Sequence, residues 1–408
     1  MAWRPPFACR PRRLLFFNPT LPAQPNPMQV LQAHSTGRRI LAIDALRGLV
    51  MIFMLVDHVR ETFLLHLQVA DPMDVAATPP ALFASRLVAH LCAPVFVFLT
   101  GLSAFLYASR QPDGKGAAAS FLAKRGLFLV VLELTVINFA WTAAFPPNVV
   151  YLQVIWAIGL SMLALALLVR LPRPALIVLG FLIVAGHNLL DPLHFEAGHP
   201  LHALWAVLHD RGWIEVSDTL RLRTSYPVLP WIGIICLGYA CCPWFAGTVS
   251  AAVRQRRLLT WAGVALGVFV VLRALDVYGD RPWAAGATAG ETLMAFLNVT
   301  KYPPSLLFAA LTLGIGLLLL LLLERKDGRL AAWLAVLGSA PMFFYILHLY
   351  VLQAMARGLQ AAGIAPRFDS VWPVWVLALV LTLALYPAVR AFGRFKARRR
   401  DLAWLKYL

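Results

Sequence analysis

Ionisable side chains interrupt the first long apolar stretch of the chain, residues 41–64. Asp44 and Arg47 lie near one end of this stretch, and Asp57 and His58 lie near the other. In a helix, Arg47 and His58 differ by about 1100° of rotation, which places them within roughly 20° of each other and about 16 Å apart along the axis. Charged groups inside a membrane span are costly and usually mark functional sites. A fixed cation and a titratable imidazole on one helix face suit chemistry conducted across a membrane.

Two further histidines are expected at the depth of His58. At about 1.5 Å per residue, His58 and His348 lie about 9 Å below the outer ends of their helices, and His90 lies about 12 Å below. A single buried histidine is most often a satisfied hydrogen bond between helices. Three at a similar depth, with Asp57 beside His58, favour a functional cavity in the outer half of the membrane.

The composition defines the class of protein. The chain of 408 residues is 60% hydrophobic and 13% charged, with a mean hydropathy of +0.73. No soluble globular protein needs this apolar content, and about 20 helical residues cross a hydrocarbon core of about 30 Å. We therefore predict an all-α polytopic membrane protein, a bundle of about ten transmembrane helices. The predicted spans are roughly 41–64, 82–107, 123–144, 149–169, 174–190, 226–244, 257–275, 304–323, 331–354 and 372–391.

The distribution of charge predicts how the chain is oriented. Its net charge is +17, and most of the Lys and Arg residues fall in segments that are cytoplasmic if both termini are cytoplasmic. This pattern follows the positive-inside rule. We interpret the basic residues as topology and contact with anionic lipids, and we expect no nucleic-acid partner. The expected location is the plasma membrane, with both termini in the cytoplasm, and a homodimer is one arrangement open to the chain.

Segments outside the spans carry three further expectations. Residues 1–39 are rich in Pro and Arg and are predicted to be a disordered cytoplasmic segment, with Met28 as an alternative start. Residues 40–408 form the transmembrane domain. The two longer connections, 191–225 and 276–303, are expected outside, where the first forms a lid or acceptor surface. The first connection is rich in His and Asp, but its spacing matches no ligand motif, so we expect no metal.

Several motifs together resemble the bacterial branch of the heparan-alpha-glucosaminide N-acetyltransferase catalytic-domain family. The resemblance covers nearly the whole chain from about residue 39, and CAPVFVFLTG and KYPPSL are its most specific parts. The motifs are IDALRG at 43–48, VDH at 56–58, HLCAPVFVFLTGLSAFL at 90–106, YPVLPWIGIICLGY at 226–239, LNVTKYPPSLLF at 297–308, GSAPMFFYILHLYVLQ at 338–353 and the tail KARRRDLAWLKYL.

The resemblance implies transfer of an acetyl group across the membrane. Acetyl-CoA would be used from the cytoplasmic side, and an amine or hydroxyl of a sugar or glycan would be acylated on the outer side. Coenzyme A is polyanionic and favours Arg, so we assign Arg47 and its neighbour Asp44 to the cofactor-binding set. Lys301, Tyr302 and Ser305, which precede or open the eighth span, complete that set.

Within this scheme we expect His58 to be the general base, because an imidazole titrates near neutral pH. Asp57 would orient His58 or balance its charge, although a side chain adjacent in the helix points about 100° away and could serve another partner. The acceptor side or the oxyanion would be served by His90, Lys301, Tyr345 and His348.

The chain departs from the lysosomal enzyme at these histidines. The residue that matches His58 is an Asn there, and the residue that matches His90 is an Asp. The active histidine of that enzyme lies in the loop after the first helix, where this chain offers His66. In the wider membrane acyltransferase superfamily, a histidine at the end of the first helix after an RG motif is the usual base. That pattern favours His58 over His66.

The alternative function is a transporter or flippase of a polar or lipid-linked solute. Buried His and Asp also serve proton relays, and Pro-Pro and Gly breaks occur in transporter helices. The sequence shows no inverted repeat, which argues against a transporter. A purely structural scaffold is a third class, and the buried polar layer argues against it.

Overall fold

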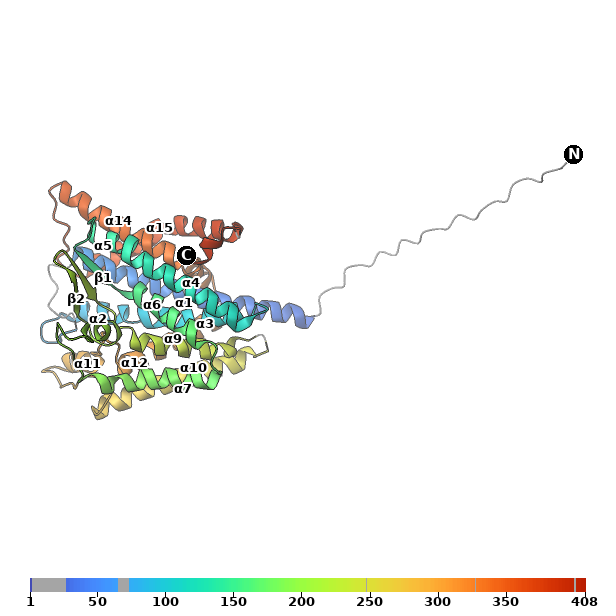
Figure 1. Cartoon of the computed structure of the whole chain (residues 1–408), viewed down its shortest axis with the longest axis horizontal. Coiled ribbons are helices and arrows are strands. Elements are labelled where there is room, and N and C mark those ends of the chain that lie inside the picture. The colour runs from blue at the N-terminus through green and yellow to red at the C-terminus, as the bar shows by residue number, and fades with distance from the viewer. Residues whose placement is uncertain (2–26, 65–72, 247, 327, 400) are drawn as a thin grey trace.

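The computed structural model describes residues 1, 27–64, 73–246, 248–326, 328–399 and 401–408. Its helices run roughly alongside one another in a bundle, with a small sheet and several short helices gathered at one end (Figure 1). α1 runs toward this end, which we call the sheet end. Residues 2–26, most of the segment predicted to be disordered, lie outside the described residues. The backbone of residues 27–39 is helical and belongs to α1, which differs from that prediction.

The chain order of the elements is as follows. The first half contains α1 (Pro27–Phe63), α2 (Pro80–Ala89), α3 (Cys92–Ala108), α4 (Gly114–Leu132), η2 (Glu133–Ile137), α5 (Asn138–Thr142), β1 (Val149–Leu152), α6 (Val154–Leu168), α7 (Arg173–Gly186) and η3 (His187–Leu190). The second half contains α8 (His202–Leu208), β2 (Trp213–Ser217), β3 (Leu220–Thr224), α9 (Leu229–Cys241), η4 (Cys242–Phe245), α10 (Ala251–Leu275), α11 (Ala289–Leu297), α12 (Leu306–Arg325), α13 (Arg329–Ser339), α14 (Pro341–Ala361), α15 (Trp372–Arg398) and η5 (Ala403–Lys406).

Six helices of the described chain are long and apolar enough to cross a membrane, so the protein is a helical membrane protein. They are Pro80–Ala108, Arg173–Leu190, Ala251–Leu275, Leu306–Arg325, Pro341–Ala361 and Trp372–Arg398. Three shorter apolar helices, Val154–Leu168, Leu229–Phe245 and Arg329–Ser339, stand beside them. The count of about ten spans stays a prediction.

Two predicted spans are built differently in the structure. The segment 331–354 was predicted as one helix, but α13 ends at Ser339 and α14 begins at Pro341. Proline has no backbone N–H and disfavours helix in the residue before it, which explains the break. The segment 149–169 begins with β1, so its helix α6 is only 15 residues long.

A three-stranded sheet corrects the all-α prediction. The strand order is β1-β3-β2, with β1 parallel to β3 and β2 antiparallel to β3. The strands read VVYL, WIEVS and LRLRT, which are rich in β-branched, aromatic and alternating residues. The prediction missed them because they are short and because two lie in the connection 191–225, where hydropathy shows no span. The parallel pairing joins β1, just before α6, to that connection.

Close helix crossings depend on glycine at particular positions. A Cβ on Gly48 of α1 would collide with the Leu334 carbonyl of α13, and one on Gly338 of α13 would collide with the Asp44 carbonyl. Gly101 of α3 meets α9 in the same way. Small residues let helix backbones approach closely, which is how membrane helices pack without a hydrophobic driving force.

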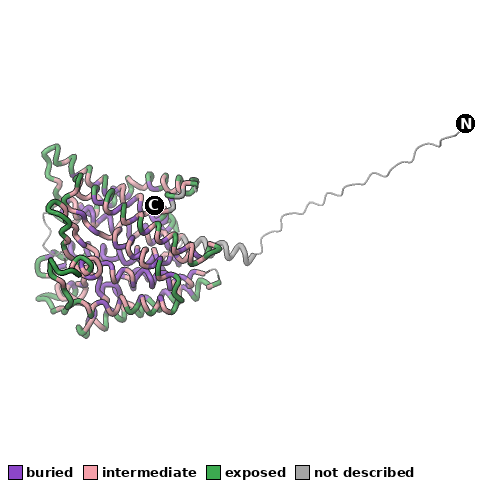
Figure 2. The backbone as a smooth tube through the Cα atoms, viewed as in Figure 1, coloured by how far each residue is buried: buried purple, intermediate pink, exposed green. Residues whose placement is uncertain are grey.

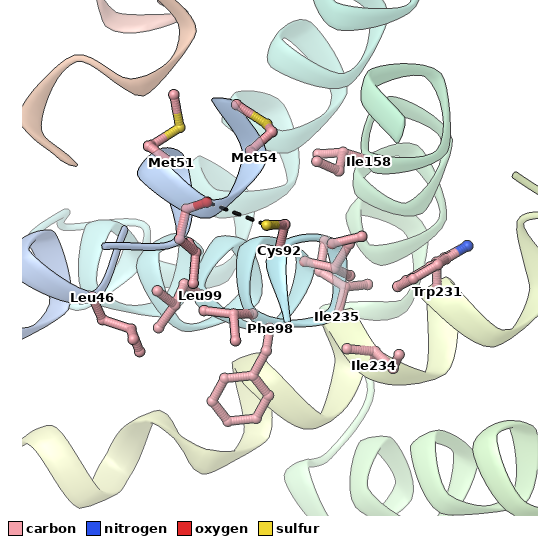
Figure 3. Close-up of a cluster of buried hydrophobic side chains, with 14 of the residues drawn as sticks. Leu46, Met51, Met54, Cys92, Phe98, Leu99, Ile158, Trp231, Ile234 and Ile235 are labelled. Atoms are coloured by element: carbon pink, nitrogen blue, oxygen red, sulfur yellow. Dashed lines mark hydrogen bonds between the residues drawn. The ribbon is translucent and has the colours of Figure 1, made fainter. Parts of the chain in front are cut away.

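One part of the core lies between α1, α3, α6 and α9. Leu46, Leu99 and Ile235 are buried there, and the Cys92 thiol donates to the Val50 carbonyl at 3.2 Å (Figure 3). Buried residues fill the interior, and exposed ones lie on the outer faces and in the loops (Figure 2). The exposed faces of the peripheral helices are apolar, as lipid contact requires. They include Val178, Phe181 and Leu182 of α7, Val264, Val270 and Val271 of α10, and Leu379, Val380 and Leu383 of α15.

Candidate functional site

A cavity of about 440 Å³ runs beside α1 from Asp44 and Arg47 to His58. We call it the inner cavity, because it opens among the helix ends opposite the sheet. Its walls carry two groups of polar side chains. Toward the open end these are Asp44, Arg47, Ser103, Arg110, Arg125 and Lys396, and toward the sheet end they are Asp57, His58, Tyr226, Lys301 and Tyr345. The predicted stripe from Arg47 to His58 therefore lines one continuous space.

Cations gather at the open end of the inner cavity. Arg47 is held by Asp44, with 2.5 Å between Nη1 and Oδ1, and it also donates to the Ser103 hydroxyl. The buried Nε of Arg125 has no hydrogen-bond partner among the described residues. Arg110 and Lys396 were missed as site residues, because both lie in segments whose charge was interpreted as topology. Two other cations of these segments, Lys124 and Arg329, do not line the cavity.

His58 is hydrogen-bonded to His348, with 2.8 Å between Nδ1 of His58 and Nε2 of His348. The other ring nitrogen of His348, Nδ1, lies 2.7 Å from the Phe344 carbonyl and must donate to it. For neutral rings this leaves Nε2 of His348 as an acceptor, so Nδ1 of His58 carries the proton. Nε2 of His58 then carries a lone pair, which is the state that a general base requires.

Asp57 serves arginines rather than His58. Its carboxylate accepts from Arg60 at 2.8 Å and from Arg86 at 2.7 Å. The side chains of both arginines are almost fully buried, so a charged partner is required to hold them there. Asp57 therefore follows the alternative that the sequence left open, in which it points away from His58 and pairs elsewhere.

A second cavity, of about 910 Å³, lies at the sheet end, and we call it the outer cavity. It is lined by His58, His90, Lys301 and Tyr302, among others. His90 is 1% exposed, and its Nδ1 has no hydrogen-bond partner among the described residues. Thus two of the three predicted histidines, His58 and His90, face one cavity. His348 is fully buried behind His58 and lines neither cavity.

The two cavities meet at a shared wall. The residues common to both linings are Asp57, His58, Val154, Tyr226 and Lys301. Nζ of Lys301 lies 5.7 Å from the ring centre of Tyr226 and 5.2 Å from that of Tyr302. The hydroxyls of these two tyrosines are 3.3 Å apart. A buried cation and an imidazole with a lone pair therefore share the point where the cavities join.

The other predicted cofactor-binding residues occupy different positions. Tyr302 lines the outer cavity, away from Arg47. Ser305 lines neither cavity: its hydroxyl caps α12 by accepting from the Phe308 amide at 3.0 Å and donates to Asp280 at 2.5 Å. A serine at this position stabilises the start of the helix, so its place in the structure gives it a structural role.

The buried carboxylate of Glu133 and the alternative base His66 complete the set of candidate residues. Oε2 of Glu133 accepts from the Trp156 amide at 3.0 Å in the first turn of α6. A carboxylate there satisfies an amide that the helix leaves unpaired. His66, the alternative base, lies outside the described residues.

Comparison with known proteins connects the chain to a family of membrane enzymes. The family model described as heparan-alpha-glucosaminide N-acetyltransferase, catalytic, matches residues 39–278. This range contains Arg47, His58 and His90, while Lys301 and His348 lie beyond it. No curated protein matches the chain.

Proposed function

Because the chain belongs to the heparan-alpha-glucosaminide N-acetyltransferase catalytic family, we propose that it moves an acetyl group from cytoplasmic acetyl-CoA to a sugar or glycan on the outer side of a bacterial inner membrane. The acceptor atom is a hydroxyl oxygen or an amine nitrogen. Membership of the family makes acyl transfer within a membrane the general activity, and the donor, the acceptor and the sidedness are the proposal.

The proposal rests on one observation: the inner and outer cavities both reach the side chain of His58. Transfer across a membrane needs a donor site and an acceptor site that open toward opposite sides and share the reacting atoms. The inner and outer cavities approach His58 from opposite ends of α1 and share its side chain. A general base must lie within reach of the proton that it removes, and His58 is available from the acceptor side.

The cations of the inner cavity support acetyl-CoA as the donor. Coenzyme A carries several phosphate charges, and guanidinium groups match phosphate oxygens well. Arg47, Arg110 and Arg125 stand with Lys396 at the open end, where the nucleotide would bind. The same cavity continues from these cations to His58, so the thioester would lie at the shared wall.

The hydrogen bonds of His58 support its role as base. His348 accepts the Nδ1 proton of His58, and Nε2 of His58 takes the proton of the acceptor as its oxygen or nitrogen attacks the thioester carbonyl. The new C–O or C–N bond forms, the C–S bond breaks, and the coenzyme A thiolate leaves and is protonated. Lys301 of the shared wall and Tyr345, which lines the inner cavity alone, would stabilise the oxyanion of the intermediate.

The direct test is transfer of labelled acetyl from acetyl-CoA by the purified full-length protein in sealed liposomes, with amino sugars and cell-envelope glycans as acceptors. We expect labelled acceptor only when donor and acceptor are supplied on opposite sides of the liposome membrane. Failure of every acceptor, together with proton-coupled uptake of a solute, would favour the transporter function instead. Transfer with both substrates on one side would contradict the two-cavity arrangement.

A further inference from the structure

A second group of polar side chains lies at the sheet end, outside the site described above. It joins His187, which opens η3 after α7, with Asp191 and with His209, which follows α8. One ligand atom of each residue lies within 4.8 Å of the other two. Nε2 of His209 is 3.4 Å from Oδ1 of Asp191, and the two imidazole centres are 5.7 Å apart. In the structure Nε2 of His209 donates to the His187 carbonyl at 3.1 Å, a hydrogen bond that a bound ion would replace. Two imidazoles and a carboxylate are a common ligand set for zinc, and the three groups would have to draw slightly closer around the ion.

Neighbouring polar groups orient two of these side chains as metal ligands are usually oriented. The second ring nitrogen of His209, Nδ1, lies 3.1 Å from Oδ1 of Asp210. A histidine that binds a metal typically donates its other N–H to a carboxylate, which fixes the ring and raises its basicity. Asn188 donates to Oδ2 of Asp191 at 2.9 Å, which leaves Oδ1 facing His209.

His187 supplies the strongest indication that a ligand belongs here. Its side chain is 2% exposed, and among the described residues neither ring nitrogen makes a hydrogen bond of good geometry, although the Pro304 backbone interacts with the ring. A buried polar group without a well-formed hydrogen bond destabilises the folded state. A cation held between His187, Asp191 and His209 would satisfy one of these nitrogens.

We propose that His187, Asp191 and His209 bind a divalent transition-metal ion of the zinc class. Such a site has three protein ligands and keeps a fourth position for water. This inference replaces the sequence expectation of no metal, which rested on spacing along the chain. The fold brings the end of α7 against the connection between α8 and β2, so ligands distant in sequence become neighbours.

The metal would tie this connection to the membrane bundle beside the outer cavity. Arg211 follows the site by two residues, lines the outer cavity and stacks on the Tyr302 ring at 4.9 Å. A bound ion would therefore hold the wall that faces the acceptor. The site is separate from His58 and does not depend on the proposed transfer reaction.

The test measures metal binding by the full-length protein, purified without an affinity tag and stripped with a chelator. After addition of Zn²⁺ and gel filtration, elemental analysis should find about one ion per chain in the wild type. Co²⁺ should give visible absorption of a low-coordinate site, and Zn²⁺ should raise the thermal midpoint. His209→Ala should bind at least tenfold more weakly, and Asp210→Asn about 10–100-fold, because that carboxylate orients His209.

Two variants make the test decisive. His199→Ala changes an exposed histidine of the same connection that is not a ligand, and it should bind Zn²⁺ like the wild type. Asp191→Asn changes an exposed ligand and should fold normally yet lose the Zn²⁺ response. Absence of any bound ion or thermal shift in the wild type would overturn the proposal, as would Asp191→Asn binding Zn²⁺ with wild-type affinity.

Discussion

The hydrogen bond to His348 determines which ring nitrogen of His58 carries the proton. Nε2 of His348 accepts from Nδ1 of His58 at 2.8 Å, because Nδ1 of His348 donates to the Phe344 carbonyl. We expect His58→Ala to reduce transfer by about 10²–10⁴-fold, the usual contribution of a general base, with acetyl-CoA binding unchanged. Initial rates and calorimetry on the same preparation measure the two effects. Near-normal activity of His58→Ala would move the role of base to His66.

In the proposed mechanism His348 positions His58, since it is hydrogen-bonded to His58 but lines neither cavity. We expect His348→Ala to lower kcat and change the pH profile of transfer, while KM for acetyl-CoA stays near the wild-type value. In His348→Gln the side-chain carbonyl can still accept from His58, so activity should partly return. Equal losses in both variants would point to packing rather than to the hydrogen bond.

Arg47 could either bind the donor or fix the end of α1, because it faces the inner cavity and also pairs with Asp44. If Arg47 binds coenzyme A phosphates, Arg47→Ala should weaken acetyl-CoA binding about tenfold or more, as for a lost charged hydrogen bond. Asp44→Asn frees the guanidinium and should keep or improve affinity, and added salt should weaken binding by the wild type. Unchanged affinity of Arg47→Ala in calorimetry would limit Arg47 to pinning the end of α1.

Helix elements are positioned by close backbone contact, most tightly where α1 crosses α13. A methyl group on Gly48 would meet the Leu334 carbonyl, so Gly48→Ala must force the two helices apart. We expect a loss of about 1–3 kcal/mol, typical of overpacking, seen as a lower thermal midpoint in detergent. Gly263→Ala is the matched control, because this glycine of α10 has nothing within 4 Å of its missing Cβ. A lower midpoint for Gly263→Ala as well would show a general effect of the substitution.

The segment around α8 depends on pH through His202. Its ring lies 2.7 Å from the Phe195 carbonyl and 2.9 Å from the Trp213 carbonyl, and these hydrogen bonds raise the pKa of His202 above its usual value. The protonated ring donates to both, so its stabilisation is complete below the ordinary histidine pKa and is lost as the pH rises through the raised value. Nearby Glu196 and Asp210 act in the same direction.

Hydrogen exchange over residues 195–217 therefore should be slower at about pH 5 than at about pH 8, after correction for intrinsic rates. The comparison needs a chelator, because metal binding weakens in acid and would act in the opposite direction. His202→Gln should remove the difference, and exposed His199→Gln should keep it. An unchanged difference in His202→Gln would assign the effect to another group.

At the scale of the whole molecule, the proposed transfer from the inner to the outer cavity requires the sheet end to face the outer side of the membrane. Asp113 lies before α4 and Asp218 lies between β2 and β3, and both are exposed. In a background without native cysteines, Asp218→Cys should react with an impermeant maleimide in intact cells. Asp113→Cys should react only after the membrane is opened. The reverse pattern would invert the orientation and put the cations of the inner cavity outside.

The sequence alone determined the features that follow from the helical period and from the distance of a residue to the end of its helix. Apolar length located most of the spans, and helical geometry put Arg47 and His58 on one face, because rotation and rise per residue are constant. It also predicted that His58, His90 and His348 lie at a similar depth, since each depth follows from a helix end; the structure buries all three and brings two of them, His58 and His90, to one cavity. Motif content led to the family that the comparison then showed.

Only the tertiary structure decided which side chains meet. Depth says nothing of rotation between helices, so it could not show that His348 lies behind His58 or that Arg86 takes the carboxylate of Asp57. The sheet and the cluster of His187, Asp191 and His209 depend on long-range pairing, which no local period encodes. Ser305 likewise proved to be a helix cap, since the role of a serine depends on the atoms that the fold brings to it.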